Sequence, residues 1–107
     1  MLNRTMQTSR ERTALSRLRQ LLNEPGFLRA TWVKMKHSCG RDSCRCKSEK
    51  RHWHVSWYVS QSRKGKPRMK SVHQERLAEV RQWVTRYQEA KRLLMIVGDA
   101  SWERLGA

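Results

Sequence analysis

Three cysteines and three of the four histidines lie within eighteen residues of this chain, between His37 and His54. Four of these groups have the spacing Cys-x4-Cys-x-Cys-x5-His. Four thiolate or imidazole groups on short spacers can surround one tetrahedral zinc ion. The sequence therefore predicts zinc as a structural cofactor, with the ligands Cys39, Cys44, Cys46 and His52. His37 and His54 are alternative fourth ligands, and reduced cysteines without a metal are the competing interpretation.

Cationic side chains stand between the predicted ligands, at Arg41, Arg45, Lys47, Lys50 and Arg51. Positive neighbours lower the pKa of a thiol and favour the thiolate that binds metal. A zinc ion with four protein ligands has no open coordination position for a substrate. The nine carboxylates of the chain also form no cluster suited to a two-metal nuclease. We therefore expect a protein that is not an enzyme.

The positive charge of the chain is concentrated in its middle third. The formal net charge is +15, of which residues 27–72 contribute +11, residues 1–26 contribute +3 and residues 73–107 contribute +1. Charge gathered in one segment is typical of a surface that binds a polyanion. A merely solvated surface is the alternative interpretation, but the uneven distribution favours nucleic acid as the partner.

The predicted nucleic-acid contacts lie in a basic loop, residues 39–52, and a hairpin, residues 61–70. Their cations would contact phosphates, and His54 and Tyr58 would lie beside them, with Tyr58 available to stack on a base. The cations are Arg41, Arg45, Lys47, Lys50, Arg51, Arg63, Lys64, Lys66, Arg68 and Lys70.

Two segments have the periodicity of amphipathic helices. In the first, Thr8 and Glu11 have the spacing of a capping box, and an apolar stripe continues to Leu22 before Pro25 and Gly26 end the helix. The second is predicted over residues 74–97, with a capping box at Ser71 and Gln74 and an end at Gly98. Its expected apolar stripe contains Leu77, Val80, Val84, Tyr87, Leu94 and Val97, with Ala90 or Lys91 between.

Between the helices, the period changes to two, which is typical of strands. Residues 31–36 and 53–60 alternate, residues 61–66 form a hairpin loop with Gly65, and residues 67–72 return as a short strand. Trp53 and Trp57 share a face with valines, so we expect them to pack in the core, with stacking on unpaired bases as the alternative. The predicted fold class is α+β: an N-terminal helix, a three-stranded antiparallel sheet with a zinc-binding loop, and a long C-terminal helix. Residues 1–7 are expected to be a flexible N-terminus and residues 8–107 a single domain.

These elements together resemble a known family. The matching residues are Arg29-Ala-Thr-Trp-Val-Lys-Met, the Cys39-Gly40-x3-Cys44-x-Cys46 motif with His52, Val55-Ser-Trp57, Gly65-Lys66 and Val80-x2-Trp83-Val84-x2-Tyr87. The order resembles a family of small basic bacterial proteins of unknown function that are often encoded near transposases and other mobile-element genes. The family follows its histidine with Gly-Pro-Tyr, whereas here Trp53-His54 follows His52. The resemblance implies a metal loop and a mobile-element setting, and it supplies no activity.

The expected function is that of a non-catalytic nucleic-acid-binding protein, an accessory component of a mobile-element or other nucleoprotein complex such as one containing a transposase. DNA is favoured over RNA because of the mobile-element setting that the resemblance implies. A structured-RNA-binding component of a ribonucleoprotein is one alternative. A protein-interaction adaptor that dimerises or docks through helix 74–97 is another. The longest unbroken aliphatic run is far shorter than the ~20 residues of a membrane span, so the expected location is the cytoplasm, in association with the nucleoid or a nucleoprotein complex.

Overall fold

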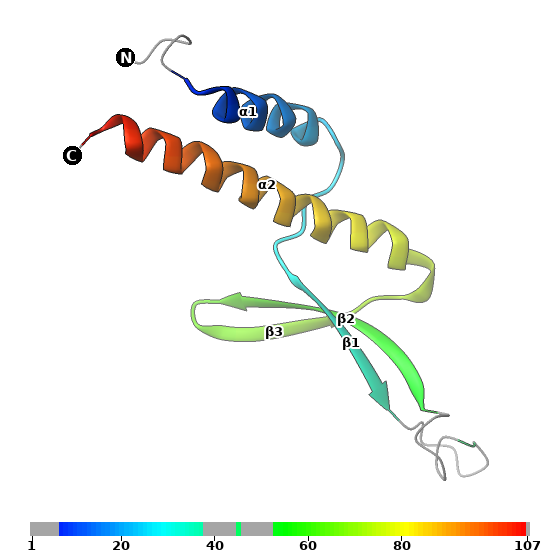
Figure 1. Ribbon diagram of the computed structural model, residues 1–107. Coiled ribbons are helices and arrows are strands. Elements are labelled where there is room, and N and C mark those ends of the chain that lie inside the picture. The colour runs from blue at the N-terminus through cyan, green and yellow to red at the C-terminus, as the bar shows by residue number, and fades with distance from the viewer. Residues whose placement is uncertain (1–6, 38–44, 46–52, 107) are drawn as a thin grey trace.

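The computed structural model describes residues 7–37, 45 and 53–106. These form an α+β arrangement of two α-helices, a 3-10 turn and a three-stranded antiparallel sheet, as predicted (Figure 1). In chain order the elements are α1 (Ser9–Leu22), β1 (Thr31–His37), β2 (His54–Arg63), β3 (Lys66–Ser71), η4 (Gln74–Arg76) and α2 (Leu77–Arg104). The predicted zinc loop, apart from Arg45, and most of the predicted flexible N-terminus lie outside the described residues.

The hydrophobic core lies between the two helices, which run antiparallel so that the start of α1 and the end of α2 lie at the same end of the helical pair (Figure 1). Buried Ala14, Leu18 and Leu21 of α1 pack with Ala90 and Leu93 of α2. No residue of β1, β2 or β3 is buried. The radius of gyration is 20.6 Å, whereas a compact chain of this size has about 13 Å. The sheet therefore projects from the helical pair instead of covering it.

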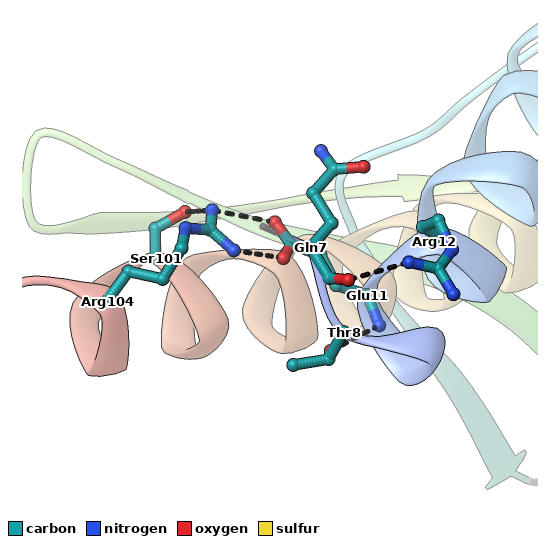
Figure 2. Close-up of polar contacts among 6 residues, drawn as sticks. All are labelled: Gln7, Thr8, Glu11, Arg12, Ser101 and Arg104. Carbon is teal, nitrogen blue, oxygen red and sulfur yellow. Dashed lines mark hydrogen bonds and ion pairs between the residues drawn. The ribbon is translucent and has the colours of Figure 1, made fainter. Parts of the chain in front are cut away.

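Helix α1 begins where the sequence predicts, but only one of the two hydrogen bonds of the predicted capping box is formed. The hydroxyl of Thr8 accepts the N–H of Glu11 at 3.0 Å, as a capping box requires. The Glu11 side chain does not return to Thr8. It forms an ion pair with Arg104 of α2, where Arg104 Nη2 lies 2.9 Å from Glu11 Oε2 and 3.1 Å from Ser101 Oγ (Figure 2). Glu11 is only 1% exposed, so this ion pair joins the helices at the edge of their core.

Helix α2 is longer than predicted, and its predicted ends are wrong. Gly98 lies inside the helix, which continues to Arg104. A helical glycine costs about 1 kcal/mol, and the packing of Ile96 and Val97 against the core, with the Arg104 ion pair beyond, opposes that cost. The glycine that follows the helix is Gly106, whose φ is 78° and whose N–H donates to the carbonyl of Glu103 at 3.1 Å.

The start of α2 also differs from the predicted capping box at Ser71 and Gln74. The 3-10 turn η4 precedes the helix, and His73 caps that turn by accepting the N–H of Glu75 at Nδ1, at 3.3 Å. Ser71 is instead the last residue of β3, opposite Tyr58 of β2. Pairing in the sheet therefore uses the residue that the capping pattern assigned to the helix.

The buried stripe of α2 differs from the predicted stripe in the second half of the helix. Val80 and Val84 are buried as expected, and of the two alternatives Ala90 and Lys91 it is Ala90 that is buried, but Leu93 is buried in place of Leu94. Leu94 is 56% exposed. A period of 3.6 residues permits either continuation, and contact with α1 selects the Ala90–Leu93 side. The apolar side chain of Leu94 is thus left on the surface.

The hairpin between β2 and β3 is tighter than the predicted loop of residues 61–66. The strands continue to Arg63 and resume at Lys66, which leaves a two-residue turn. Both turn residues have positive φ, 52° at Lys64 and 76° at Gly65, as in the type I′ turn that suits the twist of paired strands. Pro67 lies on the edge strand β3 opposite Ser62, where its missing N–H is tolerated. The turn fixes the register of all three cations of β3.

Candidate nucleic-acid interface

The register of the sheet gathers most of its cations on one face. Alternate residues of a strand point to opposite faces, and directly paired residues share a face. Lys34 is paired with Trp57, Trp32 with Val59, and Val59 in turn with Lys70. We call the resulting surface the basic face. It comprises Trp32, Lys34, Lys36, Val55, Trp57, Val59, Gln61, Arg63, Lys66, Arg68 and Lys70.

The six cations of the basic face have no acidic partner within the segments that the structure describes. All six are exposed, and β1, β2 and β3 contain no aspartate or glutamate. The guanidinium of Arg68 is held by the neutral side chain of Gln61, with Nε 2.9 Å from Oε1. Gln61 Nε2 donates in turn to the carbonyl of Arg29 at 2.6 Å. Arg68 is therefore positioned by a neutral group, and no carboxylate of the described residues neutralises the positive charge of this face.

Two tryptophans lie among these cations. The ring centroids of Trp32 and Trp57 are 5.3 Å apart with a 30° angle between the planes, a favourable offset arrangement. The ammonium of Lys34 lies 5.7 Å from the Trp57 ring centroid, within reach of a cation–π interaction. Both rings are partly exposed. The expectation that Trp57 packs in the core is thus wrong, because the core lies between the helices and this ring packs only on its own sheet.

The opposite face of the sheet carries no lysine or arginine. His37 and His54 are directly paired there, with ring centroids 6.3 Å apart, and His37 Nε2 lies 2.6 Å from Ser56 Oγ. Tyr58, which the sequence analysis selected for base stacking, also lies on this face, opposite Val33. The structure therefore places His54 and Tyr58 on the face opposite the predicted contacts Arg63, Lys66, Arg68 and Lys70.

Of the predicted phosphate contacts, the structure brings together Arg63, Lys66, Arg68 and Lys70, with exposed Lys64 in the adjoining turn. It adds Lys34 and Lys36 of β1, which the sequence analysis did not select. Their alternation with Val33 and Met35 was the available signal. Arg45 is exposed. The remaining predicted contacts, Arg41, Lys47, Lys50 and Arg51, lie outside the described residues.

The predicted zinc ligands Cys39, Cys44, Cys46 and His52 likewise lie outside the described residues. Within residues 7–37, 45 and 53–106, no three histidine, cysteine or acidic side chains gather closely enough to hold a metal ion. Of the alternative fourth ligands, His37 ends β1 and His54 begins β2. The zinc site therefore remains a prediction from the cysteine spacing.

A backbone junction connects the sheet to the helical pair. The N–H of Leu28 donates to the carbonyl of Trp83 at 3.1 Å, and Gly26 lies against the Trp83 indole with a φ of 88°. Arg86 donates to the carbonyl of Pro25, and the Arg76 guanidinium lies 5.2 Å from the Trp83 ring centroid. These contacts attach the first strand of the basic face to α2.

Fold and surface together define a small α+β protein in which a helical pair supports a projecting cationic sheet. Residues 8–82 match the model of a family described as a domain of unknown function (DUF6788), and the chain belongs to this family. This agrees with the resemblance to an uncharacterised family, and the description assigns no activity. No curated protein and no solved structure matches the chain.

None of the helices in the described segments combines the length and the apolar character needed to cross a bilayer.

Proposed function

We propose that this chain is a non-catalytic nucleic-acid-binding protein, an accessory component of a nucleoprotein complex, whose basic face contacts the phosphate backbone. The observation that carries the proposal is the gathering of six exposed cations on one face of a sheet without a carboxylate. The predicted basic loop, residues 39–52, joins β1 to β2 at the Lys36 end of this face. Its cations would extend the contact, and a zinc ion bound there would supply structural rigidity.

The physical driving force is the release of counterions from the phosphates. Six neutralised phosphates give a slope of log affinity against log salt of about −5 on duplex DNA and about −4 on a single strand. Phosphate contacts position a protein without specifying sequence. Helix α1 also exposes arginines, but the charge concentrated in residues 27–72 and the alignment of six cations on one sheet face favour the sheet as the proposed contact surface.

DNA is the favoured ligand, because the resemblance implies a mobile-element setting in which an accessory protein would act beside a transposase. Structured RNA within a ribonucleoprotein is the alternative. Both ligands present phosphates to the same six cations, so the cation row itself is equally compatible with either.

The proposal is tested by fluorescence anisotropy with labelled duplex DNA, single-stranded DNA and structured RNA at two salt concentrations. The variant Lys66→Glu/Arg68→Glu/Lys70→Glu reverses the β3 row. A control with the same net charge, Arg19→Glu/Arg81→Glu/Lys91→Glu, reverses three exposed cations of the helices. We expect the β3 variant to weaken binding and to reduce the salt slope by about 1 per lost contact, while the control retains most of its affinity and slope. Equal losses in both variants would show that only net charge matters and would overturn the proposal.

A second candidate function is that of a protein-interaction adaptor, and a specific surface favours it. Near its C-terminal end, α2 exposes Leu94 at 56% and Met95 at 61%, and Leu105 beyond the helix is 79% exposed. Large apolar side chains exposed along one stretch of a helix are a feature of protein-binding surfaces. If this surface pairs with a second copy, light scattering at two concentrations should show a concentration-dependent dimer that Met95→Lys/Leu105→Lys abolishes. A wild-type monomer at both concentrations would exclude this self-pairing.

A further inference from the structure

We propose that the basic face selects an unpaired nucleic-acid strand over a duplex, with Trp32 and Trp57 as the platform on which exposed bases stack. This inference rests on the proposed function and specifies its ligand. It differs from the expectation drawn from the sequence, which placed the stacking residue, Tyr58, on the other face of the sheet.

The order of residues along the basic face has aromatic rings at its centre and cations at both ends. From the end nearest the loop, the paired rows contain Lys36, then Lys34 with Trp57, then Trp32 with Lys70. Beyond them lie Arg68 and finally Arg63 with Lys66. Successive same-face residues of a strand are about 6.7 Å apart. A strand laid along the sheet would thus meet cations before and after the two rings.

The two rings are available for a ligand because the fold does not use them in its core. The core cluster consists of helical residues, with Phe27, Ile96 and Val97 packed against it. Trp32 and Trp57 remain partly exposed although they are among the largest side chains of the chain. Lys34 lies 5.7 Å from the centroid of the Trp57 ring. The flexible side chain of an exposed lysine can move from the ring to a phosphate at little cost, which would open the ring to a base.

An aromatic platform distinguishes single strands from duplexes for a geometric reason. In a duplex the base faces are covered by their stacked neighbours, so side chains reach only the phosphates, the sugars and the base edges. In an unpaired strand the faces can stack on aromatic side chains. Each base stacked on an aromatic side chain strengthens binding by about tenfold, with little dependence on sequence. Duplex DNA would therefore bind through the cations alone, and more weakly.

The tryptophans also distinguish an unpaired nucleic-acid strand from an acidic protein segment, which could pair with the same cations. Carboxylate side chains present no planar π-face for stacking, so the binding of an acidic peptide would depend on the cations and not on the rings. Poly-glutamate therefore serves as the probe for that outcome.

The test compares the wild-type protein and two variants by fluorescence anisotropy on labelled oligo-dT, oligo-rU, mixed-sequence duplex DNA and poly-glutamate. Trp32→Leu/Trp57→Leu removes both rings, and the matched Trp32→Phe/Trp57→Phe keeps a ring at each position. Circular dichroism melting verifies that each variant is folded. Oligo-dT and oligo-rU serve as two sources of the same unpaired strand, and their ratio reports any choice between DNA and RNA.

We expect wild-type protein to bind the single strands at least about tenfold more tightly than duplex DNA at equal salt. The leucine variant should lose that preference, and the phenylalanine variant should retain most of it. Should the leucine variant fail to fold, the wild-type preference and the quenching of its tryptophan fluorescence by oligo-dT still test the inference.

The possible results separate this inference from the proposed function. Equal wild-type affinity for single strands and duplex, or an unchanged preference in the folded leucine variant, would overturn the single-strand inference and leave phosphate binding intact. Poly-glutamate binding as tight as that of oligo-dT would also overturn it. Absence of binding to every nucleic acid would overturn the proposed function itself.

Discussion

The helical pair and the sheet use their residues in opposite ways. The helices bury the core and neutralise cations in ion pairs: Glu11 with Arg104, Glu24 with Arg86, Glu79 with Arg76 and Glu89 with Arg92. The sheet has no buried residue, and its six basic-face cations have no acidic partner in the described segments. The helical core stabilises the fold, whereas the proposed ligand contact belongs to the sheet, because charges attract a polyanion best when no carboxylate neutralises them.

The largest expected effect is on the core. Leu93→Ala, at a side chain only 3% exposed in the helical interface, should lower the free energy of unfolding by about 2–5 kcal/mol, measured by urea denaturation. The matched change Leu94→Ala, one position further along the same helix and 56% exposed, should cost less than about 1 kcal/mol. Equal costs would mean that α1 does not cover the Leu93 side of α2.

The next effect concerns the ion pair between the helices. The hydrogen bond from Arg104, together with its charge, holds the pKa of Glu11 below the ordinary value of 4.5, although burial opposes this shift. Because the folded pKa lies below the unfolded one, the carboxylate contributes stability above pH 4.5 and loses it as the pH falls through the folded value. Glu11→Gln should thus destabilise the protein at neutral pH and flatten its stability profile below pH 4.5.

Glu89 provides the control for this prediction. Its pKa is also lowered, mainly by a hydrogen bond from Arg92, but the partners lie on one helix and are 31% and 59% exposed. Such exposed pairs contribute little. Thermal melts from pH 3 to 7 should therefore show a smaller change for Glu89→Gln than for Glu11→Gln. A larger change for Glu89→Gln than for Glu11→Gln would contradict the role of Glu11 in joining the helices.

A smaller effect on stability is expected in the sheet, where binding should change instead. The Lys66→Glu/Arg68→Glu/Lys70→Glu variant should unfold in urea within about 0.5 kcal/mol of the wild type for each substitution, because the three side chains are exposed and have no acidic partner within the described residues. Its nucleic-acid affinity should nevertheless fall. A loss of stability comparable to that of Leu93→Ala would contradict the division between the two regions.

The smallest expected effect on the helical pair is that of metal removal. Purified protein should contain about one zinc ion per chain if Cys39, Cys44, Cys46 and a histidine are ligands. A chelator should weaken nucleic-acid binding, whereas the helical circular dichroism should change little because the core lies between α1 and α2. Protein purified without zinc would disprove the metal prediction. Collapse of the helices on chelation would show that the two regions depend on each other.

Local sequence patterns predicted most of the helices and strands because these elements depend mainly on interactions between near neighbours in the chain. The alternation of residues 53–60 correctly indicates β2, and Thr8 with Glu11 correctly indicates the start of α1. The predicted loop at residues 61–66 was too long, because positive φ at Lys64 and Gly65 lets the strands continue to the turn. The end predicted at Gly98 was wrong, because contacts across the helical pair outweigh the cost of one glycine.

The candidate site was predicted only in part for a different reason. The cations of residues 63–70 were evident in the sequence, but their alignment with Lys34 and Lys36 depends on the pairing of three strands. The burial of Trp57 was misjudged because alternation shows which residues share a face and not which face is covered. Which face of the sheet is covered depends on where the helices lie.

The amino-acid sequence by itself determined the order of helices and strands, the concentration of positive charge and the alternation that sorts residues onto two faces, since each depends on near neighbours or on composition. Only the tertiary structure decided that the helices bury each other and leave the sheet uncovered. It also decided that Glu11 pairs with an arginine 93 positions away. Such contacts depend on the packing of distant segments, and burial is a property of the assembled chain.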